Sequence, residues 1–128
     1  MVERRRRKRL PWVAMHAQVK IKKNMLSSEW VEVEVIDYNS LGIGIRSELE
    51  LDSDRRIQLS LRLETEVGDI SVERINGVIR HSHMEEKGRF FGIEFDEKSK
   101  EATRESLQRI EGIVEKYQQL TRRMETPS

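Results

Sequence analysis

Cysteine is absent from this 128-residue chain, which excludes disulfides, thiolate nucleophiles and cysteine-ligated zinc in any compartment. Aromatic residues make up only 5% of the chain, too few for the stacking platforms that readers of single-stranded nucleic acid use. No apolar run approaches the roughly 18 residues of a membrane-spanning helix, and the N-terminus lacks the apolar stretch of a signal peptide. We therefore expect a cytoplasmic protein with no membrane span and no nucleic-acid polymer as its partner.

Length and charge indicate one small domain with a highly charged surface. The chain is of single-domain size, with 37% charged residues against 36% in the hydrophobic set. Lys and Arg number 24 and Asp and Glu 23, so the formal net charge is only +1. Cations are nevertheless concentrated near the N-terminus, where six follow one another: Arg4, Arg5, Arg6, Arg7, Lys8 and Arg9. Such a run repels itself and attracts phosphate.

Alternation of apolar and polar side chains predicts several short β-strands. The alternating segments are residues 16–23, 30–36, 57–63, 70–81 and 89–95, and a further strand resumes at Ile43 and Ile45. Turn-forming residues separate them, over 24–28 and 37–44 among others. Six or seven antiparallel strands joined by tight turns favour an all-β barrel over an α/β sheet, which would need helices between its strands.

The C-terminal part of the chain predicts a long helix over residues 97–124. This stretch has no proline, Ser99 is a plausible cap, and apolar residues recur at spacings of three and four: Leu107, Ile110, Val114, Tyr117, Thr121 and Met124. The first turns should pack on the barrel, whereas the turns from Val114 onward could project and form a homodimer. The predicted organisation is therefore a basic arm (1–12), a barrel (13–96), a helix (97–124) and a tail (125–128).

Two segments carry the residues that suggest a ligand. Arginine offers planar, bidentate donors for phosphate and also stacks on flat bases, which suits the run at Arg4–Arg9. Residues 37–42, with the sequence Asp-Tyr-Asn-Ser-Leu-Gly, add an acidic acceptor for the N–H edge of a guanine, amide and hydroxyl groups, and a glycine that lets backbone approach. Together they indicate a guanine nucleotide with phosphates.

At these residues the chain resembles the PilZ family of cyclic di-GMP receptors, over nearly its whole length. The family carries an Arg-Arg-x-x-x-Arg element before a β-barrel, which Arg4, Arg5 and Arg9 match. Its second element, Asp or Asn-x-Ser-x-x-Gly, aligns with residues 37–42, although Asn39 stands where the family usually has serine and Ser40 lies one residue later. Residues 91–95 look like the family's last barrel strand, and the following helix also fits.

The resemblance implies cyclic di-GMP lying against the barrel, as one or two molecules, with a flexible arginine arm that orders over it. Arg5 and Arg9 would hold phosphates and stack on guanine, and Asp37 would read a guanine edge. Asn39 would replace the serine and Gly42 would keep the turn open, while Arg4, Arg6 and Ser40 complete the predicted site. Binding would then order the arm and signal to a protein partner that the sequence does not identify.

One alternative function remains open, and two further classes are not favoured. A degenerate PilZ domain could have lost its ligand and act only in protein interactions, for which Asn39 is the supporting feature. A small RNA- or DNA-binding barrel would need basic and aromatic residues beyond the arm. An enzyme is not expected, because the acidic pairs are ordinary for so charged a chain, and His81 with His83 offers two ligands on one strand face without an evident third. We predict no metal and no cofactor.

Removing an arm arginine should separate binding from folding. Arg5→Ala and Arg9→Ala are each expected to abolish cyclic di-GMP binding and to leave the barrel folded, because the arm contributes little to the core. Isothermal titration measures the first effect and thermal unfolding the second. A melting temperature far below that of the wild type would contradict this division.

Overall fold

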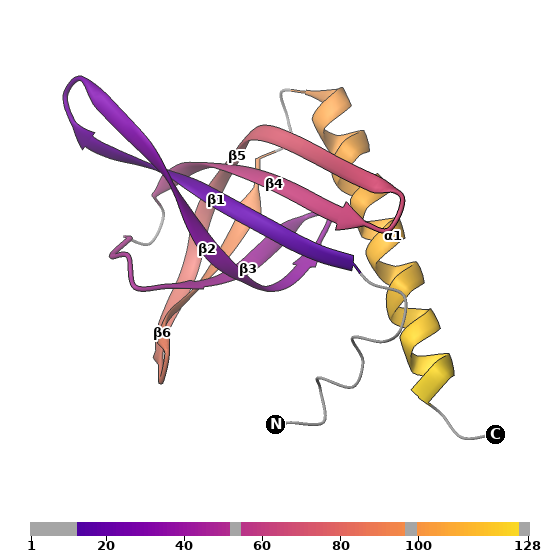
Figure 1. Ribbon diagram of the computed structural model, residues 1–128. Helices are drawn as coiled ribbons and strands as arrows, with labels where there is room; N and C mark the ends of the chain where they lie inside the picture. The colour runs from indigo at the N-terminus through magenta and orange to yellow at the C-terminus, as the bar shows by residue number, and fades with distance from the viewer. Residues whose placement is uncertain (1–12, 52–54, 97–99, 126–128) are drawn as a thin grey trace.

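Six antiparallel strands close into a barrel, and one helix follows them (Figure 1). The computed structural model describes residues 13–51, 55–96 and 100–125. The elements are β1 (Val13–Asn24), β2 (Ser27–Asn39), β3 (Gly42–Ser47), β4 (Arg56–Thr65), β5 (Gly68–Glu85), β6 (Gly88–Phe95) and α1 (Glu101–Glu125). The strands pair in the order β1-β2-β3-β6-β5-β4, and β4 returns to β1. The predicted antiparallel barrel with an appended C-terminal helix is confirmed.

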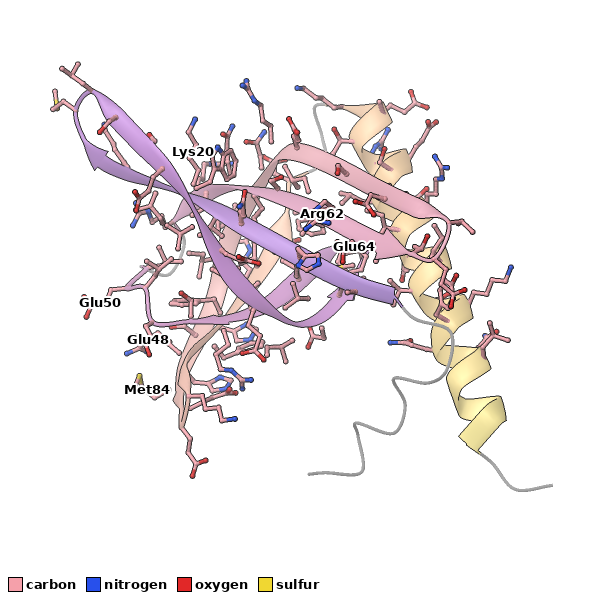
Figure 2. The ribbon with its side chains drawn as sticks, viewed as in Figure 1. Lys20, Glu48, Glu50, Arg62, Glu64 and Met84 are labelled. Carbon is pink, nitrogen blue, oxygen red and sulfur yellow. The ribbon has the colours of Figure 1, made fainter. Side chains whose placement is uncertain are left out.

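The two faces of the strands differ as the alternation requires. On β4, Leu59, Leu61 and Leu63 are buried, and the residues between them face outward. Arg62 and Glu64 lie side by side on that outer face, with a 2.6 Å ion pair (Figure 2). The hydrogen bond from Arg62, and then that from His16, lowers the pKa of the Glu64 carboxyl. Among the described residues the core is therefore aliphatic apart from Phe91 and Phe95, and no charged side chain is buried.

Two bulges shift the strand register on one side of the barrel. On β2 the pairing moves from Val35 with Ile45 to Asp37 with Gly44. On β5 it moves from Ile79 with Ile93 to His81 with Gly92, which leaves Arg80 as the extra residue. A bulge turns two successive side chains toward one face. Arg80 and His81 are accordingly both exposed on the outside.

Helix α1 packs against the end of the barrel where β2 turns into β3. Leu107 and Ile110 are fully buried there. The hydroxyl of Tyr38 donates to the carbonyl oxygen of Leu107 at 2.8 Å, and the backbone N–H of Ser40 donates to the carboxylate of Glu111 at 3.2 Å. The apolar stripe of the helix is thus used first for packing on its own barrel, as the spacing predicted.

The distal turns of α1 border a groove beside the β4–β5 turn. Ile113, Tyr117 and Leu120 line it from the helix, and the other wall includes the exposed Val67; its volume is about 590 Å³. A homodimer through these turns stays a prediction.

In the part of the chain that the structure describes, no helix is both long and apolar enough to cross a membrane.

Several predicted boundaries were wrong. The turn expected over residues 37–44 contains only Ser40 and Leu41, because β2 continues to Asn39 and the bulge merely interrupts its alternation. The first hairpin turns at residues 25–26 rather than over 24–28, and β5 extends beyond residue 81 to Glu85. Lys100 lies outside the helix, so the predicted start at residue 97 was too early. Ser99 and the arm of residues 1–12 lie outside the described residues.

Shortening a buried side chain of helix α1 should destabilise the whole domain. Ile110→Ala is expected to lower the free energy of unfolding by about 2–5 kcal/mol, because it leaves a cavity between the helix and the barrel. Gln108→Ala, at an exposed position of the same helix, should change it by about 0.5 kcal/mol or less. Urea denaturation compares the two, and equal losses would argue against a docked helix.

Candidate functional site

A shallow cavity of about 440 Å³ opens on the outer face of β2, β3, β6 and β5. Four of its lining residues come from the segment singled out in the sequence: Asp37, Asn39, Leu41 and Gly42. The others come from β3, β5 and β6, and include side chains that sequence reasoning did not assign to the site. The strand order explains the meeting, because β3 lies between β2 and β6, and β6 pairs with β5.

Glycines form the floor of this cavity. Gly44 and Gly92 face each other in the β3–β6 pairing. A Cβ atom on Gly44 would lie 2.6 Å from a carboxylate oxygen of Asp37 and 2.8 Å from the ring of Phe90, and one on Gly92 would overlap the ring of His81. These three side chains therefore rest directly over the strand backbone. Glycine inside a strand is typical of such close approach, and it is the signal that could have indicated this floor.

Ring side chains gather on one side of the floor. The ring of Phe90 lies 5.7 Å from that of His81 and stacks on that of His83 at 5.0 Å with an interplanar angle of 21°. His83 in turn contacts the carboxylate of Glu85 at 3.0 Å. This contact, followed by the hydrogen bond from Arg46, lowers the pKa of the Glu85 carboxyl. The stack is thus anchored by a carboxylate at one end, and its other end borders the cavity.

Asn39 shapes the turn that borders the cavity. Its side-chain oxygen accepts hydrogen bonds from the backbone N–H of Leu41 at 2.7 Å and of Gly42 at 3.1 Å. Asparagine favours such local turns because its short side chain reaches the backbone two residues on. Gly42 is required next to it, since a Cβ there would lie 2.5 Å from the backbone oxygen of Ile93.

The other predicted site residues lie elsewhere or outside the described residues. Ser40 does not line the cavity, and its backbone N–H binds the helix carboxylate of Glu111. Arg4, Arg5, Arg6 and Arg9 lie outside the described residues. The first described residue, Val13, lies at the same barrel end as Asn39, because β1 and β2 are antiparallel.

One ion pair and one further carboxylate line the cavity. Arg80 donates from Nε to the carboxylate of Glu94 at 2.6 Å, and Glu94 pairs across the strands with Gly42. Asp37 is exposed above the glycine floor. Among the described residues, no group of three or more His, Asp or Glu side chains is placed to hold a metal ion. The cavity can thus offer carboxylate acceptors, an amide, an arginine and ring faces to a polar, flat ligand.

The turn should tolerate serine at position 39 better than alanine. Asn39→Ala removes the acceptor of two backbone N–H groups and is expected to cost about 0.5–1.5 kcal/mol of unfolding free energy, since water satisfies the exposed groups in part. Asn39→Ser keeps an oxygen and should recover at least half of this loss. Asn76→Ala, which removes one 3.3 Å bond to Gln58, is the control. Equal stabilities of the Ala and Ser variants would contradict the role of the oxygen.

A solved structure supports the fold. The crystal structure of YcgR from Escherichia coli, in complex with c-di-GMP, superposes on this chain with a TM-score of 0.58 at 13% sequence identity. The superposition covers 85% of this chain but only 46% of the other, so this chain spans less than half the length of that protein. At this identity the likeness concerns the fold alone. No match was found among curated proteins.

A family model gives the stronger result. The model of the PilZ domain matches residues 3–111, from just before the arginine run to the first half of α1. PilZ domains are non-catalytic modules that generally bind cyclic di-GMP, which agrees with the prediction that the chain is not an enzyme. Because this match spans well over half of the chain and its barrel has the corresponding form, the chain belongs to the PilZ domain family.

Proposed function

We propose that this chain is a receptor for cyclic di-GMP, which it holds between the glycine-floored cavity and the arginine arm. The observation that carries the proposal is that Asp37, Asn39 and Gly42, chosen from the sequence motif, line one cavity on the outer barrel face. Family membership supports the ligand class. In this proposal the arm orders on the ligand, and the change is passed to a protein partner.

The chemistry of the cavity suits guanine. Guanine presents neighbouring N–H donors on one edge, and the exposed carboxylate of Asp37 is an acceptor for them. The amide nitrogen of Asn39 is a donor, while its oxygen is already bound to the turn. The glycine floor admits a flat ring to the backbone, and Phe90 with His81 offers a ring face beside it.

The arm is long enough to bring its arginines to this face. Arg9 precedes Val13 by four residues, a span of at most about 14 Å when extended, and Arg5 by eight, at most about 29 Å. Spans of this length would allow both arginines to reach the barrel end from which β2 and β3 turn. Two arginines would give the ligand phosphates the bidentate donors that the described cavity supplies only through Arg80.

Asn39 does not speak against binding in this proposal. The serine usual at its position in the family has one side-chain oxygen, and Asn39 uses its oxygen to bind the turn amides. The turn that carries it also contacts α1 through Tyr38 and Ser40. A ligand that moves the turn therefore moves groups bonded to the helix, which gives the signal a route to a partner.

A cytoplasmic location, usual for PilZ domains, stays a prediction.

Isothermal titration with cyclic di-GMP tests the proposal, with GTP and cyclic di-AMP as controls. We expect saturable binding of cyclic di-GMP alone, micromolar or tighter, with the stoichiometry showing whether one or two molecules enter. Asp37→Ala should weaken it at least about tenfold, which is the loss of one good charged hydrogen bond. Asp69→Ala, which removes an exposed carboxylate at the β4–β5 turn, should leave it unchanged.

The receptor proposal would be overturned if cyclic di-GMP at high concentration gave no heat of binding and also showed no competition in a binding assay. The chain would then be a PilZ domain without ligand, working as a protein-interaction module. Its barrel face and α1 would be the surfaces on which to seek the partner.

A further inference from the structure

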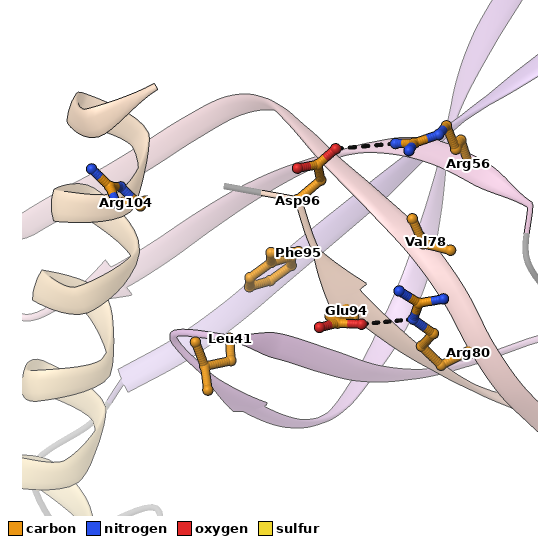
Figure 3. A pocket seen from close by; sticks show the side chains of 8 residues that line it. All are labelled: Leu41, Arg56, Val78, Arg80, Glu94, Phe95, Asp96 and Arg104. Atoms are coloured by element: carbon orange, nitrogen blue, oxygen red, sulfur yellow. Dashed lines mark hydrogen bonds and ion pairs between the residues drawn. The ribbon is translucent and has the colours of Figure 1, made fainter. Parts of the chain in front are cut away.

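Arg80 lies on the wall between two cavities. The second cavity, of about 490 Å³, lies between the β5–β6 face and the first turns of α1, and contains Arg56, Asp96 and Arg104 (Figure 3). It shares three lining residues with the glycine-floored cavity: Leu41, Arg80 and Glu94. The two hollows therefore meet along the Arg80–Glu94 pair, immediately beside the turn that carries Gly42.

Arg80 shares its face of the barrel with His81 because of the β5 bulge. Ile79 is buried, so alternation along the strand already directs Arg80 outward, and the bulge keeps His81 on the same outer face. Both residues line the glycine-floored cavity. Arg80 is the one lysine or arginine among the described residues that line this cavity. Asp37 and Glu94 are the two carboxylates that line it.

The Arg80–Glu94 pair is of a kind that a ligand can replace. The two side chains are 54% and 56% exposed, and such surface pairs contribute little to the stability of a protein. A phosphate diester presented in the cavity offers arginine an equally good anionic acceptor with bidentate geometry. The carboxylate of Glu94 competes with that phosphate for Arg80 and also repels it.

We propose that Arg80 is a phosphate-binding residue supplied by the barrel itself, and that Glu94 holds its guanidinium at the junction until a phosphate of the ligand takes over that contact. The proposal rests on the proposed function for the identity of the ligand, and on the cavity geometry for the position of the anion. It assigns phosphate recognition to a strand residue that belongs to neither sequence motif.

Titration of four proteins tests it: the wild type, Arg80→Ala, Glu94→Gln and Arg56→Ala. Arg80→Ala should weaken cyclic di-GMP binding at least about tenfold and make its affinity less dependent on salt, as expected when one cation leaves a phosphate. Glu94→Gln should bind several-fold more tightly, because the competing carboxylate is gone. Arg56 forms a 3.0 Å pair with Asp96 and lines only the second cavity, so Arg56→Ala should bind like the wild type.

Two results would overturn the inference while the receptor function stood. One is wild-type affinity in Arg80→Ala, and the other is equal weakening in Arg80→Ala and Glu94→Gln, which would mean that the pair only maintains the wall. Thermal unfolding of each variant checks that the barrel is intact, as expected for exposed side chains.

A second measurement does not depend on cyclic di-GMP. The Nε–H resonance of Arg80 is followed by NMR during titration with inorganic pyrophosphate, with the Arg56 resonance as reference. A saturable shift at Arg80 alone supports the anion site even if the wild type fails to bind the dinucleotide. No shift at Arg80, or equal shifts at both arginines, would refute it.

Discussion

The antiparallel pairing of β3 with β6 brings strand glycines to the outer barrel surface, and the candidate site depends on this contact. Gly44 and Gly92 face each other, and the carboxylate of Asp37 and the rings of Phe90 and His81 fill the space that Cβ atoms would occupy. Gly42 lets the turn approach the backbone of Ile93. Side chains at these positions would push the neighbouring strands and rings apart, so the cavity has its shape because these three residues have no side chain.

The motif segment has two sides with different partners. Asp37 and Asn39 line the cavity, whereas Tyr38 and Ser40 bond to the helix α1. Alternation along β2 separates Tyr38 from Asp37 and Asn39, since successive strand residues point to opposite faces, whereas Ser40 lies in the turn and contacts the helix through its backbone N–H. The buried contacts of Leu107 and Ile110 hold the helix against the same barrel end. A short segment thus connects the glycine-floored cavity to a helix through only a few hydrogen bonds.

Charge on this protein is abundant, and among the described residues several charged side chains form ion pairs at the surface. Arg80 with Glu94, Arg56 with Asp96 and Arg62 with Glu64 all lie on the outer surface. Pairs of this kind contribute little to stability, because water competes for both partners. They orient the two side chains of each pair but hold them together only weakly. An ion pair of this kind can therefore be replaced at little cost in stability.

The sequence by itself determined the class of fold, the helix and the segment at residues 37–42, because alternation, helical spacing and turn composition are local properties. It also allowed the PilZ resemblance, which rests on short motifs. It placed turn boundaries poorly: a bulge at Ile36 looks like the end of a strand, since it breaks alternation while pairing continues. Only the tertiary structure brought Arg80, His81, Phe90 and Glu94 to the motif. Strand order and bulges decide which distant residues share a face, and neither is written in the local pattern of a single strand.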